Sequence, residues 1–147
     1  MATLQTAGYR WCETANFCRP GHEARHNLGY WEGRDYLGLG VGAVSTLGLE
    51  RRRNRPGLVP YIQALESGQA PPSQIEPLTV DERGEERVML GLRLDRPLAL
   101  AGLERLLDAG QLERMQAAGV LAIAGGAMSL SERGRFMAND VVSSILR

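Results

Sequence analysis

The sequence has no lysine and only two cysteines, Cys12 and Cys18, among its 147 residues. The spacing of the two cysteines matches no common zinc knuckle, and nothing else in the sequence indicates the secretion that would favour a disulfide. Cys18, His22 and His26 form a C-x3-H-x3-H cluster. A closed zinc site needs a fourth ligand, and the nearest candidate, Cys12, lies in a predicted strand. We therefore expect no bound metal.

Long hydrophobic runs are also absent. No stretch approaches the ~18 consecutive apolar residues of a membrane-spanning helix, so we expect no membrane span. The first residues lack a basic region followed by an apolar run, so we expect no signal peptide and a cytoplasmic location. Hydrophobic residues nonetheless make up 44% of the sequence, which supports a folded core and excludes a disordered tail.

The sequence has no excess of charge of either sign, because 17 arginines balance 17 acidic residues. A neutral chain is poorly suited to non-specific nucleic-acid binding, so we expect no nucleic-acid partner. The clearest local charge run is Arg51, Arg52, Arg53 and Arg55. Such a run is most often a solvated surface, although arginine also binds carboxylates through its bidentate guanidinium group.

Hydrophobic periodicity and turn residues predict the elements of the first half. β-Forming residues at 9–13 predict a strand, and Asn, Pro and Gly predict a loop at 14–21. The other elements predicted here are a helix at 22–31, a buried strand at 36–47, a strand at 49–54, a helix at 57–67 and a proline-rich linker at 69–77.

The second half is predicted to be a small helical domain. Thr79 and Glu82 have capping-box spacing at the start of a helix that runs to about Leu94, and Gly125-Gly126 suits a two-residue hairpin turn. Further helices are predicted at 100–107, 111–118 and 131–146. Three helices, a hairpin and a closing helix are the order of a winged-helix-like domain. Its predicted recognition helix and hairpin carry too little positive charge to favour DNA binding.

Residues 26–31, His-Asn-Leu-Gly-Tyr-Trp, contain the pattern H-N-x-x-Y-W. This pattern resembles a motif of radical-SAM haem chaperones, the relatives of oxygen-independent coproporphyrinogen III oxidase. Later phrases resemble the family in the same order, at 36–45, 89–94 and 130–134, so the resemblance covers nearly the whole chain. One departure is Val44, where the family commonly has histidine.

The resemblance implies an α/β (α+β) fold in two parts. Residues 1–68 would be the last strands of a partial (β/α) radical-SAM barrel, 69–77 a linker, and 78–147 a winged-helix-like accessory domain. The sequence lacks the family's C-x-x-x-C-x-x-C loop, whose cysteines hold the [4Fe-4S] cluster that cleaves S-adenosylmethionine. We therefore expect the cluster and S-adenosylmethionine to belong to a longer parent protein, and the chain alone not to be an enzyme.

The resemblance also implies a function in haem metabolism. The parent would bind haem and deliver it to acceptor proteins. The partners of this chain would then be haem or porphyrin, the amino-terminal half of the barrel and a haem-acceptor protein. The alternative is a fragment of an enzyme that oxidises coproporphyrinogen propionates without oxygen. A third hypothesis, from a different class, is a winged-helix interaction module.

Three sets of residues are candidate ligand contacts, and we identify no catalytic residue. The haem set is His26, Asn27, Tyr30 and Trp31. The glycine set, which resembles the family's S-adenosylmethionine pocket, is Gly38, Gly40, Gly42 and Ala43. The arginine set, which could bind haem propionates, is Arg51 and Arg53. Each set has a structural alternative: aromatic packing for the first, a tight backbone corner for the second and a solvated surface for the third.

Overall fold

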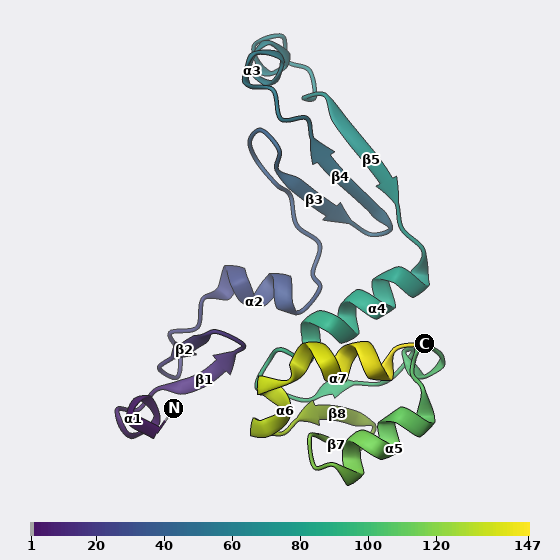
Figure 1. Cartoon of the computed structure of the whole chain (residues 1–147). Coiled ribbons are helices and arrows are strands. Elements are labelled where there is room, and N and C mark those ends of the chain that lie inside the picture. The colour runs from purple at the N-terminus through teal and green to yellow at the C-terminus, as the bar shows by residue number, and fades with distance from the viewer. Residues whose placement is uncertain (1) are drawn as a thin grey trace. The chain divides into compact units, whose positions relative to one another are not determined.

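The computed structural model describes residues 2–147 and divides into two compact units (Figure 1). The core unit combines Met1–Gly33 with Gly84–Arg147, and the middle unit is Arg34–Arg83. This division differs from the predicted boundary at 69–77, because residues that are distant in sequence pack together in the core unit. Within residues 2–147, no helix is both long enough and apolar enough to cross a membrane.

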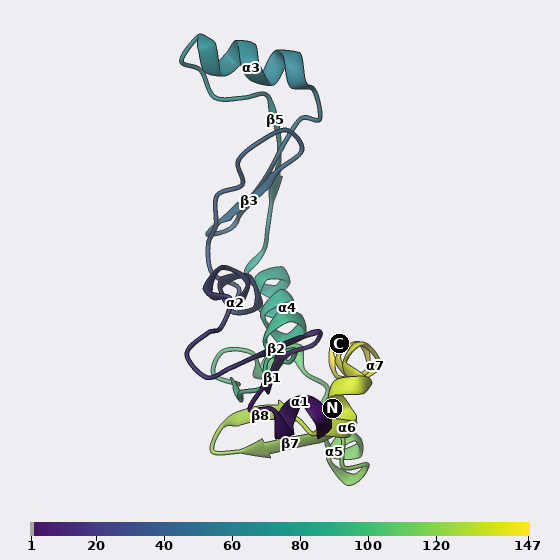
Figure 2. The same cartoon turned by 90° about the vertical axis from the view of Figure 1, so that its left-hand side faces the viewer.

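The middle unit is a three-stranded antiparallel sheet with one helix. Its strands are β3 (Val44–Leu47), β4 (Glu50–Asn54) and β5 (Ser73–Pro77), in the order β3-β4-β5. Helix α3 (Leu58–Glu66) connects β4 to β5 and lies beyond one end of the sheet in both views (Figures 1 and 2). The turn between β3 and β4 uses Gly48, whose φ of 56° suits glycine.

The core unit begins with a small hairpin and a helix. These amino-terminal elements are α1 (Ala2–Thr6), β1 (Arg10–Glu13), β2 (Asn16–Cys18) and α2 (Arg25–Trp31). Helix α4 (Val80–Gly91) then leads from the middle unit into the core unit. The elements after it are β6 (Leu98–Ala99), a 3-10 turn at Glu104–Leu106, α5 (Ala109–Ala117), β7 (Leu121–Ala124), β8 (Ala127–Leu130), α6 (Glu132–Phe136) and α7 (Ala138–Ile145). The order of the second sheet is β6-β8-β7.

The hydrophobic core of the chain lies among these later elements. Its least exposed side chains come from α4, β8 and α7 and the segment that follows α4; they are Val88, Leu92, Met128, Val141 and Ile145. All members of this buried cluster fall between residues 88 and 145. The segment that follows α4 is held in place because its side chains Leu92 and Leu94 are buried. The same segment carries Arg93 and Arg96, so the positions of these two arginines are held as well.

Helix caps follow the sequence pattern closely. The Thr79 N–H donates to Glu82 Oε2 at 2.7 Å, and the Glu82 N–H donates to Thr79 Oγ1 at 3.1 Å, so the predicted capping box is confirmed. The Thr79 N–H is also the main reason that the pKa of Glu82 is lowered. Ser131 caps α6 by accepting from the Gly134 N–H at 3.1 Å. The hairpin at Gly125-Gly126 is likewise confirmed, with φ of 58° and 74° at the two glycines.

Several predicted elements differ from the observed ones, and glycine backbone geometry explains two of the differences. The loop predicted at 14–21 contains β2, and the linker predicted at 69–77 contains β5, which pairs with β4. In the strand predicted at 36–47, only 44–47 is a strand, because Gly40 and Gly42 have φ of 108° and 69°. The helix predicted at 100–107 is interrupted by Gly102, with φ of 81°, and the closing helix breaks at Met137.

A mixed α/β fold with antiparallel sheets is confirmed. Every strand pair among residues 2–147 is antiparallel. The order of elements after α4 is short strand, 3-10 turn, helix, hairpin and two helices. The finer assignments, to barrel strands and to a winged-helix-like domain, stay predictions.

Gly134 provides a test of how tightly the core unit is packed. A Cβ atom at this position would overlap the backbone carbonyl oxygen of Val120, which a side-chain movement cannot relieve. We expect Gly134→Ala to lower the free energy of unfolding by about 1–3 kcal/mol. The measurement is urea denaturation followed by circular dichroism.

Gly110 supplies the matched control. Its Cβ would lie 3.4 Å from Asp108 Oδ1, and it stands inside α5, where alanine is the better helix former. Gly110→Ala should therefore leave stability unchanged or raise it. Equal urea midpoints for the two variants would contradict the proposed close contact at Gly134.

Candidate functional site around helix α2

Helix α2 presents part of the haem set to solvent. His26 and Tyr30 are one helical turn apart, and their rings meet edge to face with centroids 4.8 Å apart. His26 and Asn27 are exposed, and Tyr30 is 36% exposed. The imidazole is therefore supported by an aromatic ring and remains accessible to a ligand.

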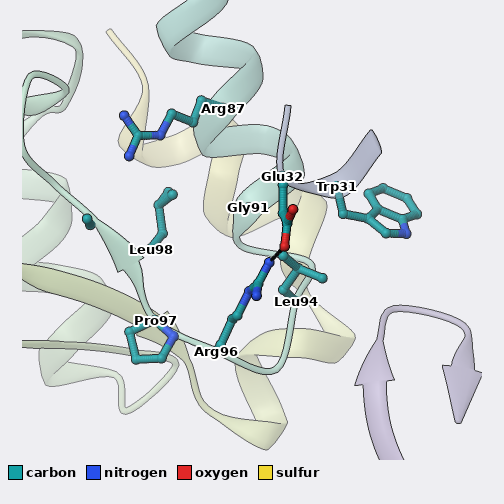
Figure 3. A pocket seen from close by; sticks show the side chains of 9 residues that line it. Trp31, Glu32, Arg87, Gly91, Leu94, Arg96, Pro97 and Leu98 are labelled. Carbon is teal, nitrogen blue, oxygen red and sulfur yellow. Dashed lines mark hydrogen bonds and ion pairs between the residues drawn. The ribbon is translucent and has the colours of Figure 1, made fainter. Parts of the chain in front are cut away.

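The carboxyl-terminal end of α2 is anchored instead of exposed. The Arg93 guanidinium lies 5.6 Å from the centre of the Trp31 ring, and Arg93 Nη2 also donates to Asn139 Oδ1 at 2.7 Å. The next residue after the helix, Glu32, forms an ion pair with Arg96 (Figure 3). Both arginines come from the segment that follows α4. The haem set thus has three exposed residues, His26, Asn27 and Tyr30, and one anchored residue, Trp31.

A small pocket lies beside this anchor. It has a volume of about 180 Å³, and its wall includes Trp31, Arg87 and the Glu32–Arg96 pair (Figure 3). Gly91 allows the wall to close, because a Cβ there would lie 2.8 Å from Leu98 Cδ1. The pocket is too small for a porphyrin ring.

The two cysteines lie in the hairpin that precedes α2, and both are buried. The Cys12 thiol donates to the Asn16 carbonyl oxygen at 3.2 Å. Burial, followed by the hydrogen bond with Cys18, raises the pKa of Cys12 to about 11. A neutral buried thiol is a poor metal ligand. His22 is exposed, and residues 2–147 contain no group of three or more His, Cys, Asp or Glu side chains that could hold a metal ion.

The glycine set forms an irregular loop in the middle unit. A Cβ at Gly38 would overlap the Val44 backbone, and the Gly38 N–H donates to Ser45 Oγ at 3.0 Å. Gly40 is held from both sides, because its N–H donates to Tyr61 Oη at 3.0 Å and its carbonyl accepts from Asn54 Nδ2 at 2.9 Å. These contacts support the tight backbone corner. Gly42 and Ala43 complete the loop, from which Leu37, Leu39 and Val41 are exposed.

The arginine set lies on β4. Arg51 and Arg53 are two residues apart in a strand, so they share one face of the sheet. Arg51 is partly buried and forms an ion pair with Glu76 at 3.7 Å, whereas Arg53 is exposed. On the other face, Arg52 donates to Glu50 at 2.8 Å. The haem set belongs to the core unit, and the glycine and arginine sets belong to the middle unit.

Comparison of the sequence and the fold with known proteins shows the family to which this chain is related. Residues 78–137 match the model of the HemN C-terminal domain. The solved structure of coproporphyrinogen III oxidase (HemN) from Escherichia coli, described as a radical SAM enzyme, has the same fold over 97% of this chain and 38% of its own. The TM-score is 0.69 and the sequence identity 22%. The chain thus corresponds to the carboxy-terminal part of a HemW/HemN-like radical-SAM protein.

Two of the similar curated relatives are named heme chaperones. The heme chaperone HemW of Mycobacterium tuberculosis (strain ATCC 25618 / H37Rv) is 38% identical over 148 residues, which cover 99% of this chain and 37% of the relative. The heme chaperone HemW of Bacillus subtilis (strain 168) is 28% identical over 153 residues, which cover 99% of this chain and 40% of the relative. The chain therefore spans less than half of the length of these relatives.

The sequence analysis missed the residues that anchor α2. Glu32 and Arg96 are separated by 64 positions, so no local pattern joins them. Arg93 stands between Leu92 and Leu94, which are both buried. An arginine within such an apolar segment was the one feature of the sequence that could have indicated a structural contact. Arg135, which contacts Trp11 in the hairpin before α2, was also missed.

The raised pKa of Cys12 leads to a prediction about its reactivity. A rise from 9.0 to about 11 leaves about a hundredfold less thiolate in the folded protein at pH 8. We expect iodoacetamide to alkylate Cys12 in a Cys18→Ser variant far more slowly under native conditions than in urea, as measured by peptide mass spectrometry. Equal native and urea rates would contradict the burial described here.

The same shift predicts a pH dependence of stability. The folded pKa lies above the unfolded value, so the unfolded chain releases the Cys12 proton first as pH rises. Stability should be unaffected by Cys12 below pH 9 and should fall between pH 9 and 11. A Cys12→Ala variant should lack that part of the fall, measured as the urea midpoint against pH.

Proposed function

We propose that this chain binds haem through helix α2, as the carboxy-terminal portion of a haem chaperone-like protein that delivers haem to acceptor proteins. The observation that carries the proposal is the accessible His26 imidazole, which is supported by Tyr30 on a helix anchored at its far end. The similarity to heme chaperones over 99% of the chain supports the same ligand.

The side chains of α2 fit a haem ligand. Imidazole nitrogen is a common axial ligand of haem iron, and haem bound there would supply the metal-centred chemistry that is carried to the acceptor. His26 would hold the iron, and Tyr30 would orient the imidazole through the edge-to-face contact. Asn27 is exposed beside them and can hydrogen-bond polar groups of the ligand. Trp31 would hold the helix in place through Arg93.

The residues present do not fit a [4Fe-4S] cluster, which uses four thiolates when all of its protein ligands are cysteines. The sequence has two cysteines, and both are buried. We therefore assign the cluster and S-adenosylmethionine to the longer parent protein. The glycine set is proposed to contribute to the S-adenosylmethionine pocket there. Its loop shape, held by Tyr61 and Asn54, is compatible with that role.

The surface of the middle unit supports the proposal that another part of the parent protein packs against this chain. Exposed large apolar side chains gather on α3 and the glycine loop, including Leu37, Leu39, Leu58, Val59 and Leu65. Exposed apolar clusters commonly mark surfaces that another structure covers. The proposed cover is the amino-terminal half of the barrel. Arg51 and Arg53 remain proposed contacts for haem propionates from this unit.

A second candidate function is oxygen-independent oxidation of coproporphyrinogen by the parent protein. The observation that favours this second candidate is the fold similarity to coproporphyrinogen III oxidase from Escherichia coli. The higher sequence identity to heme chaperones favours the first candidate. Turnover of coproporphyrinogen by the cluster-loaded parent would favour the oxidase, and transfer of bound haem without turnover would favour the chaperone.

Histidine substitution tests the haem proposal directly. We expect haem titration to shift the Soret band of the chain, and His26→Ala to weaken binding by at least about tenfold, because the axial ligand is lost. His22→Ala is the matched control, since His22 is also exposed but precedes α2. A Soret band that does not move, or that moves equally in His26→Ala, would refute haem ligation by His26.

A further inference from the structure

A second pocket of the core unit lies at the start of α7. It has a volume of about 210 Å³, and its polar lining comes from two guanidinium groups, one hydroxyl, one amide and one carboxylate. These groups belong to Arg93, Arg135, Thr14, Asn139 and Asp140. With two cationic side chains against one anionic side chain, the pocket favours a ligand that carries negative charge.

Arg135 is the most constrained group in this lining. Its Nη1 donates to the Trp11 carbonyl oxygen at 2.8 Å, and its guanidinium lies 3.8 Å from the centre of the Trp11 ring. Its Nε and Nη2 are buried and have no acceptor among the described residues. Burial lowers the pKa of Arg135, whereas the carboxylates of Asp95 and Glu13 oppose that shift. Buried donors without acceptors are costly, and a ligand oxyanion is suited to supply the acceptors.

The helix end adds to the same preference. Helix α7 spans eight residues, Ala138–Ile145, and no side chain caps its amino terminus. The first-turn residues Ala138, Asn139 and Asp140 line the pocket. Backbone N–H groups at a helix amino terminus favour an anion. Asp140 offsets part of this charge but leaves the two arginines in excess.

The rim of the pocket is apolar and open. Phe136 is 68% exposed and Met137 is 41% exposed, although both are large hydrophobic side chains. The Phe136 ring lies 5.1 Å from the Trp11 ring, so it is supported from behind. The pocket is also next to the haem set, because Arg93 contacts both Trp31 and Asn139. An apolar platform beside two guanidinium groups suits an apolar ring that carries a carboxylate arm.

We propose that this pocket binds a propionate carboxylate of haem or porphyrin through Arg135 and Arg93, with the ring edge against Phe136 and Met137. The pocket volume admits one carboxylate arm and excludes the macrocycle. The inference deepens the proposed function, on which it rests for the identity of the ligand. It assigns propionate recognition to the core unit, in addition to the arginine set on β4.

The test compares porphyrins with and without free carboxylates. Iron-free protoporphyrin IX and its dimethyl ester are titrated against the full chain, with fluorescence as the readout, so that ligation by His26 does not contribute. We expect the free acid to bind about tenfold or more tightly than the ester. Arg135→Met should lower the affinity for the acid to that for the ester and leave the ester unaffected.

Two further variants make the result specific. Arg133→Met removes an exposed arginine from the same helix outside the pocket and should bind both porphyrins as the unchanged chain does. Asn139→Asp adds a carboxylate at the first turn of α7, where it suits the helix end and can pair with Arg93. It should preserve the melting temperature and still weaken binding of the free acid. This variant decides the matter if Arg135→Met fails to fold.

The outcomes separate the pocket from the proposed function. Equal affinity for acid and ester, or equal loss of both in Asn139→Asp, would overturn the pocket while leaving haem ligation by His26 intact. If Arg135 had only a structural role, for example by pairing through water with Glu13 Oε2, the unchanged chain would bind the free acid and the ester with equal affinity. Arginine-dependent binding of the free acid, together with an unmoved Soret band on haem titration, would uphold the pocket and refute the proposed function.

Discussion

Helix α2 depends on two arginines that are not part of it. Arg93 lies against Trp31, and Arg96 pairs with Glu32, so the carboxyl-terminal end of the helix is fixed to the segment that follows α4. That segment is itself fixed, because Leu92 and Leu94 are buried beside the arginines. A helix of seven residues is too short to be stable alone, so these contacts supply the order that its own hydrogen bonds cannot.

This anchoring connects α2 to residues that lie far along the chain. Residues 78–137, which match the HemN C-terminal domain, contain both anchoring arginines and Arg135. Arg135 contacts the hairpin that precedes α2. It donates a hydrogen bond to the Trp11 carbonyl oxygen, and its guanidinium lies against the Trp11 ring. The elements on either side of α2 are therefore held by the same domain. The same residues that enclose the core thus also fix the end of the helix that carries His26.

In the middle unit, the glycine loop is held by contacts within the unit itself. Its glycines allow a backbone corner, since Gly38 passes against Val44 and Gly40 is bound by Tyr61 and Asn54. Because the corner has these internal contacts, its shape does not require a ligand. Leu37, Leu39 and Val41, which alternate with these glycines, remain exposed.

The sequence by itself determined the features that depend on neighbours in the chain. The capping box at Thr79, the hairpin at Gly125-Gly126 and the strand at 9–13, observed as β1, follow from local backbone chemistry. The helix predicted at 22–31, which carries the H-N-x-x-Y-W pattern, is observed as α2 at Arg25–Trp31. Only the tertiary structure decided which arginines contact the end of that helix, because Arg93 and Arg96 are far from it along the chain. Long-range ion pairs and cation–π contacts have no periodicity, so they become visible only when the packing of the core brings their partners together.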